Sequence, residues 1–82
     1  MTEVETKIIA IIAKELSLPQ QPELTDSLDK FEADSLDRAE IIFSIEDKFG
    51  IELKIPNKET AVKIFSTVQS VADFVTGHLK TK

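Results

Sequence analysis

The spacing of apolar residues is the feature that most limits what this chain can fold into. From Glu3 to Leu16, isoleucine and valine recur three or four positions apart with charged residues between them, which predicts an amphipathic first helix. Pro19 and Pro22 follow and are expected to stop that helix. No segment alternates between polar and apolar residues for long enough to predict a sheet. We therefore expect an all-α fold.

Capping residues delimit a second helix. Asp34 is a suitable N-cap and Gly50 can take the left-handed conformation that closes helices, which predicts a helix from about Ser35 to about Phe49. The long polar connection before this helix, residues 17–33, carries three apolar residues that could fasten it to a core. These residues are Leu24, Leu28 and Phe31.

Two shorter patterns complete the chain. An apolar stretch around residues 61–65 predicts a third helix of about one or two turns. Residues 66–69, Ser-Thr-Val-Gln, have the form of a capping box and predict the start of a fourth helix. We expect one domain over residues 1–82: a small four-helix bundle with a long loop between helices one and two and a short third helix.

The charge and the absence of cysteine exclude several classes of function. Fifteen acidic against ten basic residues give a net charge of -5, which disfavours nucleic-acid partners and favours a basic protein surface. With no cysteine there is no disulfide framework, and the protein is expected in the reducing cytoplasm. No apolar run approaches the roughly 20 residues of a membrane span, so stable membrane insertion is not expected. We also expect a monomer.

The second helix has two apolar faces. One face is the expected core stripe and contains Ile41, Ile42, Ile45 and Phe49. The opposite face carries two large apolar side chains among acids, namely Leu36 and Phe43 with Asp37, Glu40, Glu46 and Asp47. Apolar anchors ringed by charge are typical of a protein-docking surface. Alternatively, the acids are simply solvated and the two apolar side chains contact the long loop; the spacing leaves both readings open.

Two segments resemble acyl carrier proteins. Residues 32–37 read Glu-Ala-Asp-Ser-Leu-Asp at a helix start, and residues 45–52 read Ile-Glu-Asp-Lys-Phe-Gly-Ile-Glu. The resemblance is specific because it combines Asp-Ser-Leu, a glutamate five residues after the serine and an acidic pair before Phe-Gly-Ile. It implies that Ser35 carries 4'-phosphopantetheine, transferred from coenzyme A by a phosphopantetheinyl transferase. The arm would supply the thiol that a cysteine-free chain lacks, and acyl groups would be carried on it as thioesters.

The same resemblance implies a carrier and not an enzyme. Its partners would be acyl-chain synthases, reductases, dehydratases or acyltransferases with basic docking patches. The residues that would recognise partners are Asp34, Leu36, Asp37, Glu40, Phe43, Glu46 and Asp47. An acyl chain would tuck between the helices against Ile41, Ile45, Phe49 and Ile64, although ordinary core is the alternative interpretation of those four.

Several features complicate this assignment. Residues 26–28 repeat Asp-Ser-Leu inside the expected loop, but Ser27 opens no two-faced helix, so we assign the attachment site to Ser35. Glu32 stands where the family commonly has glycine, which removes backbone freedom. Arg38 lies among the acids near the arm, and the connection after Gly50 is longer than in the common fatty-acid type. Together these departures leave room for a specialised carrier.

Other functions are also compatible with a small acidic helical chain. A peptidyl or aminoacyl carrier would share the fold and Ser35 but hold a different cargo. A calcium-binding loop starting at Asp29 would end properly at Glu40, but it places Phe31 and Ala33 at ligand positions and Asp34 where glycine is needed. The one histidine, His78, has no evident nucleophile beside it, so we expect neither catalysis nor a metal site.

Overall fold

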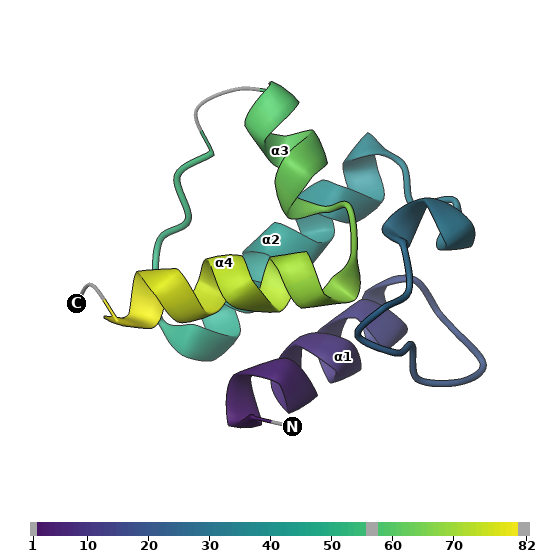
Figure 1. The fold of residues 1–82 in the computed structure, drawn as a ribbon, viewed down its shortest axis with the longest axis horizontal. Helices are drawn as coiled ribbons and strands as arrows, with labels where there is room; N and C mark the ends of the chain where they lie inside the picture. Colours follow the sequence, from purple (N-terminus) through teal and green to yellow (C-terminus); the bar gives the residue numbers. More distant parts are fainter. Residues whose placement is uncertain (1, 56–57, 81–82) are drawn as a thin grey trace.

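The computed structural model describes residues 2–55 and 58–80, and this part of the chain forms four α-helices (Figure 1). They are α1 (Glu3–Glu15), α2 (Ser35–Phe49), α3 (Lys58–Ile64) and α4 (Val68–Lys80). Over the described residues there is no strand, only an isolated bridge between Ser27 and Thr67. α1 packs against both α2 and α4, and α3 packs against α4. The all-α fold with a short third helix is confirmed.

Local capping explains where α1 begins and ends. Thr2 and Glu5 form a reciprocal capping box, in which each side chain accepts a hydrogen bond from the backbone N–H of the other residue. At the other end Ser17 takes a left-handed conformation, φ 53°, two residues before Pro19. The helix therefore ends at Glu15, and the left-handed Ser17 redirects the chain ahead of the proline that would have broken the helix.

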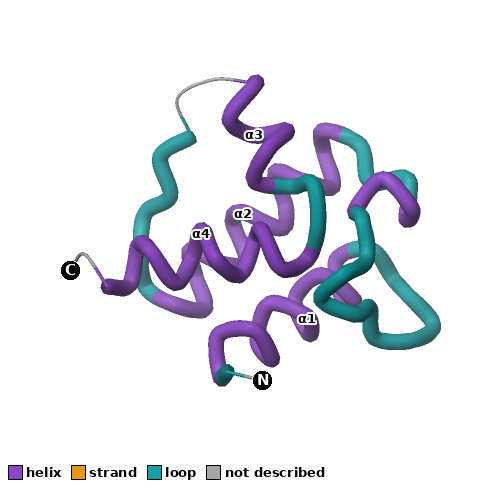
Figure 2. The backbone as a smooth tube through the Cα atoms, in the orientation of Figure 1, coloured by secondary structure: helices purple, strands orange, loops and turns teal. Residues whose placement is uncertain are grey.

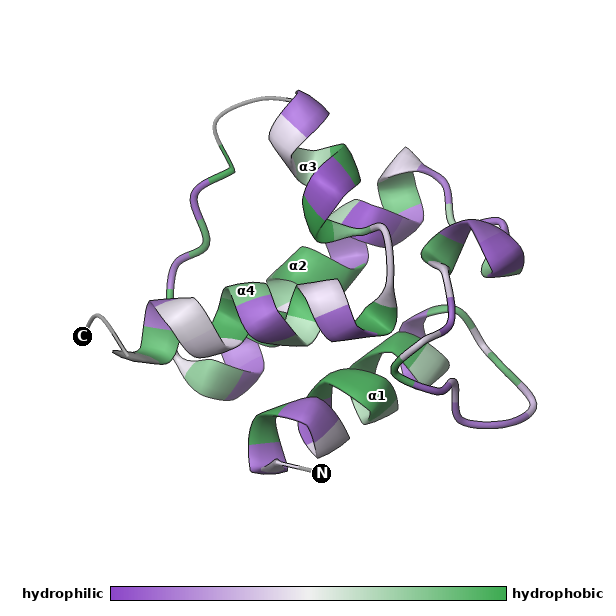
Figure 3. Ribbon diagram, viewed as in Figure 1, coloured by the Kyte–Doolittle hydropathy of each residue, from purple (hydrophilic) through white to green (hydrophobic). Residues whose placement is uncertain are grey.

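The core is built from branched aliphatic side chains contributed by all four helices and the two longer connections. Hydrophobic and hydrophilic residues alternate around the helices in Figure 3, as expected for amphipathic helices packed on a shared core. The fully buried large side chains are Ile8, Ile12, Leu28, Ile41, Ile45, Val68, Val71 and Val75. Ile42 and Phe49 of the predicted stripe are half-buried at its edge.

The connection between α1 and α2 contains a 3-10 helix, η1 (Leu28–Phe31), that the sequence patterns did not predict. Leu28 is fully buried, and Leu24 and Phe31 pack against the core, so the three predicted apolar anchors are confirmed. Figure 2 shows the connection leaving α1 and passing beside the start of α4. This placement brings loop carbonyl groups to the first turn of α4.

Those carbonyl groups accept hydrogen bonds from backbone N–H groups that α4 cannot satisfy internally. Val68 donates to the Asp26 carbonyl at 3.0 Å, and Gln69 donates to the Leu24 carbonyl at 2.9 Å. The predicted capping box was one residue out of place: Thr67 is the N-cap, and its hydroxyl accepts from the Ser70 N–H at 3.0 Å. Ser66 and Thr67 are both competent caps, so residue type alone did not decide between them.

Candidate functional site

Ser35 is the first residue of α2, directly after an N-cap that holds the helix end in place. The Asp34 carboxylate accepts a hydrogen bond from the Asp37 N–H at 2.9 Å, and the Asp37 carboxylate accepts one from the Asp34 N–H at 3.3 Å. At the far end Gly50 has φ 64°, the left-handed conformation predicted for it. The predicted bounds of this helix are confirmed.

The Ser35 hydroxyl is exposed and uncommitted. Its Oγ has no hydrogen-bond partner among the described residues, and the same holds for the backbone N–H groups of Ser35 and Leu36. Two open N–H groups at the start of a 15-residue helix favour an anion, because they and the helix dipole present positive charge there. An attached phosphodiester therefore fits this position.

The outer face of α2 presents two large apolar side chains to solvent. Leu36 is 67% exposed and Phe43 is 64% exposed, so neither is covered by the long loop. Glu40 and Asp47 on the same helix are exposed as well. A third exposed apolar side chain is Val62 on α3. The sequence pattern does not predict its exposure, because a seven-residue helix offers too few turns to separate its faces.

Three acids assigned to partner recognition also make contacts within the protein: Asp34 and Asp37, which form the capping box of α2, and Glu46. Glu46 is half-buried, and its Oε2 accepts a hydrogen bond from the Leu53 N–H at 2.8 Å, which fastens the connection after α2. Asp37 is half-buried in the capping box. Of the acids predicted for recognition, Asp34, Glu40 and Asp47 are the exposed ones.

The residues expected to line an acyl pocket lie in the closed core. Ile41, Ile45 and Ile64 are buried, and Phe49 is half-buried beneath Lys7, whose Nζ lies 5.6 Å from the ring centroid. A groove of about 400 Å³ runs between α1 and α2, but none of the four predicted residues lines it. Entry of an acyl chain between the helices would therefore require these side chains to separate.

The two unusual residues near Ser35 have structural consequences. Glu32 is left-handed, φ 57° and ψ 35°, and ends η1, so a side chain occupies the kind of backbone position that glycine suits. Arg38 Nη2 contacts Asp29 Oδ1 at 3.4 Å and so links the first turns of α2 to η1.

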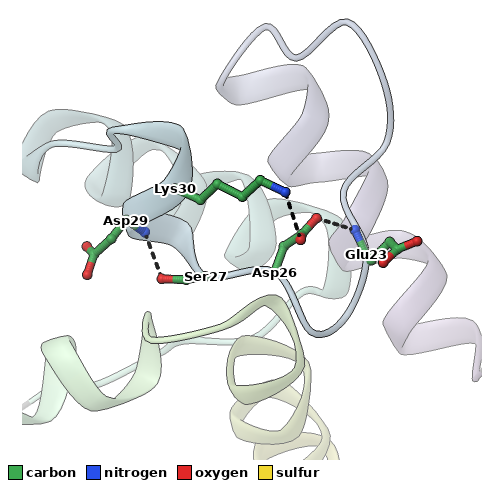
Figure 4. Close-up of polar contacts among 5 residues, drawn as sticks. All are labelled: Glu23, Asp26, Ser27, Asp29 and Lys30. Atoms are coloured by element: carbon green, nitrogen blue, oxygen red, sulfur yellow. Dashed lines mark hydrogen bonds and ion pairs between the residues drawn. The ribbon is translucent and has the colours of Figure 1, made fainter.

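The Asp-Ser-Leu segment at residues 26–28, in the connection between α1 and α2, has a structural role (Figure 4). Asp26 Oδ2 accepts a hydrogen bond from the Glu23 backbone N–H at 2.9 Å, and its Oδ1 lies 3.2 Å from Lys30 Nζ. The Glu23 N–H, aided by Lys30, lowers the pKa of the Asp26 carboxyl group. Ser27 is the N-cap of η1, with its Oγ accepting from the Asp29 N–H at 3.2 Å.

The calcium-loop alternative is incompatible with the backbone. An EF-hand needs residues 29–40 as one continuous loop, but residues 29–31 lie in η1 and residues 35–40 in α2. Within residues 2–55 and 58–80 no group of three or more acidic or histidine side chains could hold a metal ion. His78 lies edge-on to the Phe74 ring, 4.4 Å between centroids. Over the same residues, no helix has both the length and the apolar character to cross a membrane.

Comparison with known proteins agrees with this geometry. Residues 6–75 match the family model described as phosphopantetheine attachment site. Acyl carrier proteins 3, 1 and 4 of Cuphea lanceolata, all named as chloroplastic, are each 37% identical over 76 residues, and each match covers 89% of this chain. The match covers 50% of the first and 51% of the other two, so the chain spans about half the length of these curated relatives. The chain belongs to the phosphopantetheine attachment family, whose covalently attached group is 4'-phosphopantetheine.

Proposed function

We propose that this chain is an acyl carrier protein and that Ser35 is its attachment site. The observation that carries the proposal is an exposed, uncommitted serine hydroxyl beside two open backbone N–H groups, inside the segment that matches the family. Ser27 lacks this arrangement, because its hydroxyl already caps η1. When bound, the cofactor supplies a thiol on a flexible arm, to which an acyl group can be held as a thioester.

The residues around Ser35 have distinct roles in this proposal. Asp34 and Asp37 keep the first turn of α2 rigid, so that the hydroxyl is presented at one place on the surface. The Ser35 and Leu36 N–H groups offset the negative charge of the phosphodiester. No group of this chain needs to perform chemistry on the cargo, which is the expected property of a carrier and not of an enzyme.

The outer face of α2 is the proposed docking surface for partner enzymes. Leu36 and Phe43 would fill apolar pockets, while Glu40, Asp47 and Asp34 would attract a basic rim. The proposed partners are a phosphopantetheinyl transferase and acyl-chain synthases, reductases, dehydratases or acyltransferases. Fatty-acid, polyketide or lipid biosynthesis is the proposed pathway class, and the relatives are named acyl carrier proteins.

Organisation and compartment are also part of the proposal. Residues 1–82 would act as one monomeric carrier domain. The absence of cysteine suits a reducing compartment such as the cytoplasm, whereas the relatives are named as chloroplastic proteins. A peptidyl or aminoacyl cargo is less favoured, because the relatives are named acyl carriers. Transferring defined acyl and aminoacyl groups to the loaded protein would distinguish the two cargoes.

The carrier role is tested by intact mass after incubation with coenzyme A and a broad-specificity phosphopantetheinyl transferase. We expect wild-type protein to gain the mass of one phosphopantetheine and Ser35→Ala to gain nothing. Ser27→Ala is the matched control and should be modified like the wild type. No gain under conditions that fully modify a known carrier would refute the proposal.

The docking surface is tested by binding to a basic partner enzyme at several salt concentrations. Glu40→Lys should weaken binding at low salt, with the difference shrinking as salt screens the charges over about 8–10 Å. Glu52→Lys, an exposed charge reversal in the connection after α2, serves as the control. Phe43→Ala should raise the dissociation rate with little loss of stability, since the ring is exposed. Equal affinity of wild type and Glu40→Lys at low salt would refute the proposed docking surface.

A further inference from the structure

Arg38 has hydrogen-bonding capacity that the protein itself leaves unused. Its side chain is mostly covered, at 27% exposed, and its Nε is buried without a hydrogen-bond partner in the described part of the chain. Its Nη2 reaches Asp29 Oδ1 at 3.4 Å, and the Asp29 side chain is 85% exposed. Long ion pairs to exposed carboxylates contribute little to stability. The guanidinium group is therefore available to a stronger anionic partner.

The position of Arg38 in the helix also calls for negative charge. Its backbone N–H donates to the Asp34 carbonyl at 3.0 Å, so it lies in the first turns of α2, where the helix dipole disfavours a cation. The carboxylates of Asp34 and Asp37, at the start of the same helix, are engaged in the capping box. Among the described residues Asp29 is the one carboxylate that pairs with Arg38. An anion at the start of the helix would offset the unfavourable interaction between the Arg38 cation and the positive end of the helix dipole.

Ser35 lies within reach of Arg38. Residues three apart on a helix have Cβ atoms about 5–6 Å apart. Helical side chains lean toward the N-terminus, so the Arg38 side chain can extend over the turn that contains Ser35. A guanidinium group can donate two parallel hydrogen bonds to the oxygens of one phosphate. Geometry and charge thus both favour a contact between Arg38 and a phosphate attached to Ser35.

We propose that Arg38 binds the phosphodiester through which 4'-phosphopantetheine is joined to Ser35, exchanging its contact with Asp29 for the phosphate. This inference rests on the proposed attachment at Ser35. Arg38 is here a positioning residue that holds the phosphate end of the arm against α2 and leaves the thiol end mobile. Loading would also release η1 from one of its contacts with α2.

The experiment is NMR of the apo and loaded full chain, with intact mass confirming loading in each sample. In wild type, loading should shift the Arg38 Nε–H resonance and slow its exchange with water. In loaded Arg38→Gln, the ³¹P resonance should move from the wild-type value toward the value measured for the same protein unfolded in urea. The ³¹P resonance reports the phosphate contact directly, which the extent of loading does not.

Two variants separate a direct contact from a change in the fold. Asp29→Asn removes the ion pair but keeps the guanidinium group, so its loaded ³¹P resonance should match the wild type. Lys30→Gln removes a neighbouring cation of η1 and should also match. An unchanged ³¹P resonance in Arg38→Gln, or the same change in Asp29→Asn, would overturn the inference. Failure of the wild type to load would instead overturn the proposed function.

Discussion

The chain contains the tetrapeptide Asp-Ser-Leu-Asp twice, at residues 26–29 and 34–37, and the two copies have opposite environments. In the first copy the leucine, Leu28, is fully buried, while in the second Leu36 is 67% exposed. Ser27 is an N-cap, whereas Ser35 follows an N-cap by one residue. This shift of one residue turns the first hydroxyl into a hydrogen-bond acceptor for its own helix and leaves the second free.

The two copies also differ in what surrounds them. The backbone around the first copy accepts hydrogen bonds from the start of α4, so that copy is tied into the fold. At the second copy the N–H groups of Ser35 and Leu36 have no acceptor among residues 2–55 and 58–80. We propose that this difference decides which copy is modified, since only at Ser35 are the hydroxyl and the nearby backbone N–H groups left without partners in the described part of the chain.

The largest expected contrast is between the two leucines. Leu28→Ala should lower the free energy of unfolding by about 2–5 kcal/mol, because it leaves a cavity in the core. Leu36→Ala should change it by less than about 0.5 kcal/mol, because that side chain is already in water. Urea unfolding of the two apo variants measures both values. Similar losses in the two variants would break the contrast.

The two helix starts give a smaller contrast. Asp34→Ala removes the N-cap of a 15-residue helix and should cost about 1 kcal/mol of unfolding free energy, whereas Asp34→Asn should retain most of it. Ser27→Ala removes the cap of the four-residue η1 and should cost about 0.5 kcal/mol. Denaturant midpoints of the three variants decide the ranking. A greater loss from Ser27→Ala would contradict it.

Substitution can test the left-handed residue Glu32, which ends η1 just before the second copy. Glu32→Gly should raise the unfolding free energy by about 0.5–1 kcal/mol, since glycine takes the left-handed conformation without a Cβ penalty. Gly50→Ala is the reciprocal control and should lower it by about 1 kcal/mol, because it introduces a Cβ at φ 64°. A destabilised Glu32→Gly protein would show that the glutamate side chain contributes more than its backbone costs.

The smallest effect concerns the pH dependence of the first copy. The pKa of Asp26 is lowered by the Glu23 backbone N–H and then by Lys30, so its ionised form favours the folded state. That stability is present above the ordinary carboxyl pKa and is lost as the pH falls through the lowered value. The melting temperature, measured from pH 7 down to pH 3, should therefore fall less steeply with pH in Asp26→Asn than in wild type. Identical slopes would rule out this contribution.

Much of the fold could be predicted because local signals agreed with tertiary packing. The Asp34 cap, the Gly50 end and the aliphatic stripe of α2 all appear as expected. Spacing could not decide whether Leu36 and Phe43 were covered, because that depends on the path that the connection between α1 and α2 takes in three dimensions. It also could not show that Glu46 binds the Leu53 N–H, a contact that exists only once the connection after α2 folds back.

The central claim is that helix context and not the tripeptide selects the attachment site, and peptide mapping tests it directly. Trypsin cleaves after Lys14, Lys30 and Arg38, so Ser27 and Ser35 fall in separate peptides, residues 15–30 and 31–38. Mass spectrometry of loaded wild-type protein should find phosphopantetheine in the peptide of residues 31–38. Its presence in the peptide of residues 15–30 would contradict the account.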